Sequence, residues 1–159
     1  VADDKAAPAK ADKLVIKSKS GAKVTVSKAE LSTRPGSRNA KRESRRIAPA
    51  DTVPEPTSLK LYFPTLVYPG EEVKGRLKFN DKDDFVFAIF ITVFFPDGDV
   101  VTDTLYDYRI DGGDVYKGSY TFWVEIPESE TPLPGKIVIT CSDEFLNVSE
   151  VTQTFVQNF

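Results

Sequence analysis

Apolar and polar residues alternate along most of the chain after residue 58. Val73, Leu77 and Phe79 alternate with Lys74 and Lys78, for example, and a period of two is typical of a strand with one buried face. Segments rich in Gly, Pro and Asp separate these stretches and mark turns. The pattern predicts strands at residues 59–63, 72–80, 85–95, 100–110, 115–126, 135–141 and 150–156. About seven short strands with regular turns predict an all-β, antiparallel sandwich.

The start of the chain predicts a separate β-hairpin. Two short β-prone segments flank Ser20 and Gly21, which can form the turn, so a hairpin is predicted over residues 14–27. Two strands alone are marginally stable in water, so this hairpin needs a surface to pair with. We expect its apolar residues to bind a partner by adding β structure to an exposed sheet edge. These residues are Leu14, Ile16, Val24 and Val26.

The stretch that follows the hairpin has no pattern of buried positions. Ser27 and Glu30 have the spacing of a capping box, which predicts a helix of about one turn before Pro35. Residues 33–58 then contain four prolines and a basic cluster, and such a segment cannot bury a core. We therefore divide the chain into a basic extended arm, residues 1–58, and a β-sandwich, residues 59–159.

Charge sharpens this division. Residues 1–58 carry a net charge of +6 and residues 59–159 a net charge of −9, and every Phe, Tyr and Trp lies in the second part. The arm is therefore expected to dock on an acidic protein surface, either a partner or another copy, with a solvated linker as the alternative. The arm has no aromatic residues to stack on bases, so no nucleic-acid partner is expected. The docking residues predicted here are Arg34, Arg38, Arg42, Arg45 and Arg46.

One predicted strand, residues 85–95, is apolar on both faces. In a sandwich only one face of a strand meets the core. The odd-numbered residues are larger and are predicted to face the core, which leaves an even-numbered face led by Phe90 and Phe94. An exposed apolar face of this kind marks an interface, so we expect the chain's own arm, a loop or a partner protein to cover it. Acidic flanks disfavour a membrane as the cover.

Short motifs in the second part resemble those of bacterial immunoglobulin-like and fibronectin-type modules. Residues 66–73, LVYPGEEV, resemble the start of the second strand of such modules, and residues 115–120 and 134–138 resemble their penultimate strands. The resemblance implies an immunoglobulin-like sandwich over residues 59–159. The Cys and Trp pattern of antibody domains is absent, because Cys141 is the only cysteine. A fold of this kind does not by itself supply a function.

Candidate chemistry is sparse. The chain has no histidine, and Cys141 lies in an apolar run, so the usual pairs of nucleophile and base are missing and we expect no enzyme activity. Acidic turns flank the apolar strand, but they lie roughly 35 Å apart at about 3.3 Å per residue and cannot share an ion. No metal and no cofactor are expected, since Asp is common in turns for backbone reasons. The weak calcium candidates are Asp81, Asp83, Asp84, Asp97 and Asp99.

These observations predict an exported bacterial protein with a structural or accessory role. The chain begins with Val rather than Met, which we interpret as removal of a signal peptide, and no transmembrane segment is expected. Docking through the arm and the apolar sheet face would join it to a protein partner or to further copies of itself. The alternative is an extracellular ligand-binding module that holds carbohydrate or calcium in the sandwich loops.

Overall fold

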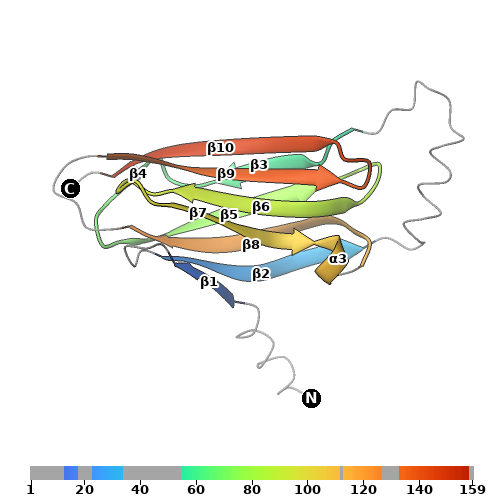
Figure 1. Ribbon diagram of the computed structural model, residues 1–159, viewed down its shortest axis with the longest axis horizontal. Helices are drawn as coiled ribbons and strands as arrows, with labels where there is room; N and C mark the ends of the chain where they lie inside the picture. Colours follow the sequence, from blue (N-terminus) through green and yellow to red (C-terminus); the bar gives the residue numbers. More distant parts are fainter. Residues whose placement is uncertain (1–12, 18–22, 34–54, 112, 127–132, 158–159) are drawn as a thin grey trace, which may run out of the picture.

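The chain folds into two β-sheets packed face to face (Figure 1). The computed structural model describes residues 13–17, 23–33, 55–111, 113–126 and 133–157. In the first sheet the strand order is β1-β2-β8-β5-β3, and in the second it is β4-β10-β9-β6-β7. One short helix, α3 (Tyr108–Asp111), follows β7. Among the residues described here, no helix has the length and apolar character needed to cross a membrane.

Both sheets are antiparallel apart from the parallel contact of β4 with β10. The strands of the first sheet are β1 (Lys13–Lys17), β2 (Lys23–Thr33), β8 (Val115–Glu125), β5 (Glu72–Asn80) and β3 (Ser58–Tyr62). Those of the second are β4 (Leu66–Val67), β10 (Val148–Gln157), β9 (Leu133–Asp143), β6 (Val86–Phe94) and β7 (Val100–Asp107). The predicted all-β, immunoglobulin-like sandwich is thus confirmed.

The N-terminal hairpin is part of this sandwich. Strands β3, β5 and β8 occupy the positions of strands A, B and E of an immunoglobulin sheet, and β2 lies beside β8 in the place of strand D. Val24 pairs with Val124 and Val26 with Phe122 across β2 and β8. The side chains of Val24 and Val26 are 0% and 3% exposed. The division at residue 58 drawn from composition therefore does not follow the sheets, because strand pairing extends the core into the basic segment.

The core lies between the sheets and is filled by aromatic and branched side chains. The alternation predicted for β5 is observed along its whole length, with Val73, Leu77 and Phe79 buried and the intervening residues exposed. Gly75 continues this buried face, and the ring of Phe122 packs where a side chain at residue 75 would lie. Full burial of one large apolar side chain contributes about 1.5–3 kcal/mol. The whole core therefore stabilises the contact between the two sheets.

Strand β6 follows the predicted pattern except near its start. Ile89, Ile91 and Val93 are buried in the core, as predicted for the odd-numbered positions. Phe87 is only half buried, so its predicted place in the core is wrong. The register of β6 with β9 shifts between Val86 and Ala88. Such a bulge places an extra residue on one strand and reverses the facing of the side chains that follow it.

Two local expectations are also wrong. Ser27 and Glu30 do not start a helix, because β2 continues to Thr33. The register of β2 with β8 shifts between Lys28 and Leu31, so the strand accommodates this polar stretch as an irregularity. The strand predicted for residues 100–110 ends at Asp107, where α3 begins. In both places the pairing of neighbouring strands, rather than local propensity, decides the conformation.

Candidate functional site

The four hairpin residues predicted to bind a partner lie in two strands of the first sheet. Val24 and Val26 contact their own sandwich, as described above. Leu14 and Ile16 lie in β1 opposite Val26 and Val24, at the edge of the first sheet. The predicted docking arginines Arg34, Arg38, Arg42, Arg45 and Arg46 lie outside the described residues.

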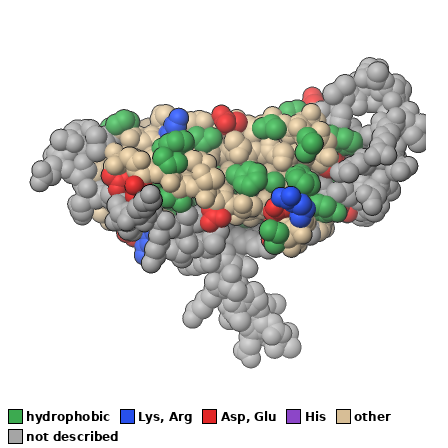
Figure 2. All heavy atoms as spheres, in the orientation of Figure 1, with side chains coloured by type: hydrophobic (Ala, Val, Ile, Leu, Met, Phe, Trp, Pro, Cys, Tyr) green, Lys and Arg blue, Asp and Glu red, His purple; other side chains and the backbone are tan. Residues whose placement is uncertain are grey.

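The apolar face of β6 has neighbours within its own sheet. Phe90 and Phe94 are half buried on the outer face of the second sheet. The ammonium group of Lys136 lies 4.6 Å from the centroid of the Phe94 ring. Phe90 lies between Thr104 and Thr140 on the two adjacent strands. In Figure 2 the apolar side chains form separate patches rather than one continuous surface. Side chains of the neighbouring strands β7 and β9 therefore cover part of this apolar face.

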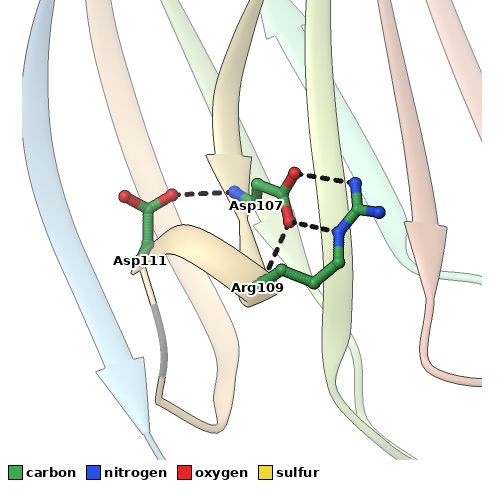
Figure 3. Close-up of polar contacts among 3 residues, drawn as sticks. All are labelled: Asp107, Arg109 and Asp111. Atoms are coloured by element: carbon green, nitrogen blue, oxygen red, sulfur yellow. Dashed lines mark hydrogen bonds and ion pairs between the residues drawn. The ribbon is translucent and has the colours of Figure 1, made fainter.

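A polar corner closes one end of the second sheet. Arg109 donates from Nε and Nη2 to the two carboxylate oxygens of Asp107 at 3.2 and 3.0 Å (Figure 3). Asp111 accepts a hydrogen bond from the backbone N–H of Asp107 at 2.8 Å. The hydrogen bonds from Arg109 hold the pKa of Asp107 below its usual value. Arg109 also lies 5.6 Å from the centroid of the Phe87 ring, so this corner covers the bulged start of β6.

Five basic residues gather on the outer face of the first sheet. Lys74, Arg76 and Lys78 alternate along β5, with Lys60 on β3 and Lys117 on β8 beside them. All five side chains are exposed, and none forms an ion pair with an acidic residue in the part of the chain that the structure describes. Lys60 lies directly opposite Lys78, and like charges in that position destabilise a sheet. We call these five residues the basic face.

A groove of about 410 Å³ runs across the basic face. Four of the five basic residues line it, together with hydroxyl and amide groups. The polar uncharged lining residues are Ser32, Ser58, Asn80 and Ser119. Glu30, which β2 contributes, is the acidic residue of the lining. The groove therefore offers many hydrogen-bond donors under positive charge, an arrangement that suits a negatively charged ligand.

Three buried carboxylates meet at one end of the sandwich. Asp81 follows β5, Asp84 lies in the loop before β6, and Asp143 is the last residue of β9. Their side-chain oxygens lie within 4.8 Å of one another. The three residues are 1%, 0% and 0% exposed. We call them the carboxylate cluster.

Hydrogen bonds fix two of the three carboxylates. Asp81 accepts from the hydroxyl of Thr57 at 2.9 Å and from the backbone N–H of Asp84 at 2.8 Å. Asp143 accepts from the backbone N–H of Phe145 at 2.9 Å and from the side-chain amide of Asn147 at 3.0 Å. Both side chains are therefore held in place by the loops that they close.

Asp84 differs from its two neighbours. Neither of its carboxylate oxygens has a hydrogen-bond partner among the residues that the structure describes. Burial, followed by the nearby Asp81, raises the pKa of Asp84 to about 9. Asp143 and the buried Glu144 shift the pKa in the same direction. The charged groups that act on Asp84 are thus all carboxylates.

The carboxylates of the remaining calcium candidates are not part of this cluster, although the backbone N–H of Asp83 donates to Asp81 at 3.1 Å. Asp83 is partly exposed and accepts a hydrogen bond from the backbone N–H of Glu55. Asp97 accepts from the backbone N–H of Asp99 in the turn between β6 and β7. Sequence reasoning named Asp81 and Asp84 only among five weak candidates, and it did not name Asp143. The turn that contains Asp143 is recognisable in the sequence, whereas its position beside Asp84 depends on the pairing of β6 with β9.

Comparison with known proteins gives a likeness in fold. No protein-family model matches the chain, and no curated protein matches its sequence. The SrpA adhesin from Streptococcus sanguinis is similar, with 15% identity and a TM-score of 0.45, over 67% of this chain and 59% of that one. A DUF4466 family protein from Parabacteroides merdae has 10% identity and a TM-score of 0.46, over 64% of this chain and 44% of that one.

The major pilin subunit BcpA of Bacillus cereus is a further similar structure. It has 11% identity and a TM-score of 0.42, over 64% of this chain and 39% of that one. This chain therefore spans less than two thirds of the length of each of these three proteins. At such identities the likeness concerns the fold, and the function has to be inferred from the residues themselves.

Proposed function

We propose that the chain is a non-catalytic structural module of an extracellular assembly, and that its basic face docks an acidic protein partner. The five cations of the basic face, none of which has an ion-pair partner among the described residues, carry this proposal. Lys60 and Lys78 are directly opposite each other, an arrangement that costs stability in the isolated sheet. An acidic partner would relieve that repulsion, so the cost is recovered on docking.

The charge distribution supports the same surface. Residues 59–159 carry a net charge of −9, yet one outer sheet face of this region is basic. Such a concentration of one sign steers an oppositely charged partner and fixes its orientation. β2 lies in the same sheet, and the arginine cluster of residues 34–46 follows β2 in sequence. We propose that this cluster extends the basic face toward the partner.

A role without catalysis is supported by the chemistry of the available groups. The chain has no histidine. Burial raises the pKa of the Cys141 thiol to about 12, so this thiol stays protonated and is a poor nucleophile at neutral pH. The buried aromatic and branched residues serve the contact between the sheets. The groove on the basic face is lined mainly by ammonium, guanidinium, hydroxyl and amide groups, with Glu30 as its acidic residue, which suits binding.

Charge reversal on the basic face tests this function. The wild-type chain, with a net charge of −3, should be retained on immobilised polyglutamate at low salt and released as salt rises. Arg76→Glu combined with Lys78→Glu should abolish retention, because both residues line the groove. Lys136→Glu, on the outer face of the other sheet, is the matched control and should remain bound. Absence of wild-type retention, or equal binding by the charge-reversed protein, would refute docking through this face.

An acidic carbohydrate is the second candidate ligand. The hydroxyl and amide groups of the groove can bind sugar hydroxyls, and the exposed ring of Tyr62 lies 6.0 Å from the ammonium group of Lys78. The same variants can be passed over an immobilised sulfated glycan and a neutral glycan. Retention on the sulfated glycan with none on polyglutamate would assign the face to carbohydrate rather than to protein.

A further inference from the structure

We propose that the carboxylate cluster, Asp81, Asp84 and Asp143, binds a calcium ion. This site lies at the end of the sandwich where the β5–β6 and β9–β10 loops meet, and it is separate from the basic face. It does not depend on the docking function proposed above. Its expected role is to fasten the two sheets together, since Asp81 follows a strand of the first sheet and Asp143 ends a strand of the second.

The spacing of the three carboxylates fits one central ion. Calcium binds oxygen ligands at about 2.3–2.6 Å, so two ligands of the same ion lie up to about 5 Å apart. The carboxylate oxygens of Asp81, Asp84 and Asp143 fall within 4.8 Å of one another. Asp143 ends β9, and Asp81 and Asp84 lie in the short loop that joins β5 to β6, so regular strands hold the site on both sides.

The surroundings of Asp84 support a bound ion independently of the spacing of the carboxylates. Its side chain is fully buried, and among the described residues neither oxygen receives a hydrogen bond. Burial of a polar group without a partner is costly, and burial of a carboxylate among other carboxylates costs more. Asp84 lies within reach of both Asp81 and Asp143, which are themselves held by hydrogen bonds. A cation between the three would supply the missing partner.

The chemistry of the ligand atoms indicates which ion the site would bind. All three ligands are carboxylate oxygens, which favour hard cations over zinc or copper. The three carboxylates lie together, and the buried Glu144 is close enough to act on Asp84, so carboxylate oxygens are concentrated here. Calcium accepts six to eight oxygen ligands in flexible geometry, whereas magnesium requires a near-ideal octahedron and keeps several waters. Calcium is therefore the better fit.

Thermal unfolding of the full chain in chelator and in calcium tests the site. At about a hundredfold excess over its Kd, calcium should raise the Tm by about 5–10 °C. Titration calorimetry should give about one ion per chain. Asp84→Asn should lower the affinity at least tenfold, and Asp143→Asn, which keeps the side-chain oxygen that caps the loop, should do the same. Asp97→Asn, in the turn at the other end of β6, is the matched control and should bind calcium as the wild type does.

Three results would overturn the proposal. One is a folded, chelator-treated wild-type chain that shows neither heat nor a Tm shift with calcium, which would mean that the carboxylates share a proton instead. Another is unchanged calcium binding by both Asp84→Asn and Asp143→Asn. The third is a stronger response to magnesium than to calcium, which would reject the assignment of the ion. Retention on polyglutamate is measured separately, so failure of this site and failure of the docking function are distinguishable.

Discussion

At the scale of single residues, Asp84 combines complete burial with the absence of a hydrogen-bond partner among the described residues. Sequence alone marks it as one acid in an acidic turn, where Asp is expected for backbone reasons. Its raised pKa arises only because the fold buries it and places Asp81, Asp143 and Glu144 nearby. The chemical character of this residue is therefore a property of the tertiary structure.

The buried position of Asp84 among carboxylates predicts how the free energy of unfolding depends on pH when chelator is present. The unfolded chain loses the Asp84 proton near its ordinary pKa of 3.8, whereas the folded chain keeps it up to about pH 9. The folded state thus binds more protons between these values, and the free energy of unfolding must fall as pH rises through them. Asp84→Asn should flatten this decline and raise the stability at pH 8 by about 1–3 kcal/mol, because the variant has no ionisable carboxyl to bury among other carboxylates.

Urea unfolding at pH 5 and pH 8, both in chelator, measures the effect. Asp97→Asn is the control, since Asp97 is exposed at the opposite end of β6. A wild-type stability that rises from pH 5 to pH 8 while Asp84→Asn leaves the profile unchanged would contradict this account of Asp84.

At the scale of elements, the contact between β2 and β8 decides what the N-terminal segment does. Gly118 in β8 faces the backbone carbonyl of Glu30 and the side chain of Leu31. A Cβ at residue 118 would collide with that carbonyl, which belongs to the irregular part of β2. Glycine is therefore required here for close approach of two backbones.

Gly118→Ala should loosen the hairpin while the rest of the sandwich stays folded. We expect about 1–3 kcal/mol of destabilisation, as for overpacking in a core, and faster amide hydrogen exchange in residues 23–33 than in β9 or β10. Ser119→Ala, at the neighbouring position in the same strand, serves as the control. Equal exchange in β2 for Gly118→Ala and the wild type would show that the contact has room to adjust.

At the scale of the whole molecule, the hairpin completes a sheet that is otherwise open at β8. Removing residues 1–54 would uncover the edge of β8 and delete the two fully packed valines of β2. The loss of two buried valines alone amounts to about 3–6 kcal/mol, a large fraction of the 5–15 kcal/mol that stabilises a typical domain. The truncated chain should therefore unfold at a Tm at least about 10 °C lower, or aggregate.

A synthetic peptide of residues 13–33 added in trans should restore part of the lost Tm, and a peptide with Val24→Asp and Val26→Asp should not. Differential scanning calorimetry of the full chain, the truncated chain and the two mixtures gives the comparison. If the truncated chain melts at the same temperature as the full chain, the hairpin does not belong to the core.

The periodicity of the sequence was sufficient for most of the sandwich. Strand β5 matches its predicted bounds, residues 72–80, because its alternation is uninterrupted. Where local signals conflicted with pairing, prediction failed: Ser27 and Glu30 read as a helix cap, and Phe87 read as a core residue. A bulge or a neighbouring strand cannot be seen in a one-dimensional pattern, because each depends on a partner far away in the sequence.

The sequence by itself determined the fold class, the apolar face of β6 and the contrast between a basic N-terminal part and an acidic remainder. These follow from local alternation and composition, which need no knowledge of long-range contacts. Only the tertiary structure decided that the hairpin pairs with its own chain and that Lys60 lies opposite Lys78 of β5. It also decided that Asp143 lies beside Asp81 and Asp84. Each of these requires the register between distant strands, which is set by packing of the whole sandwich.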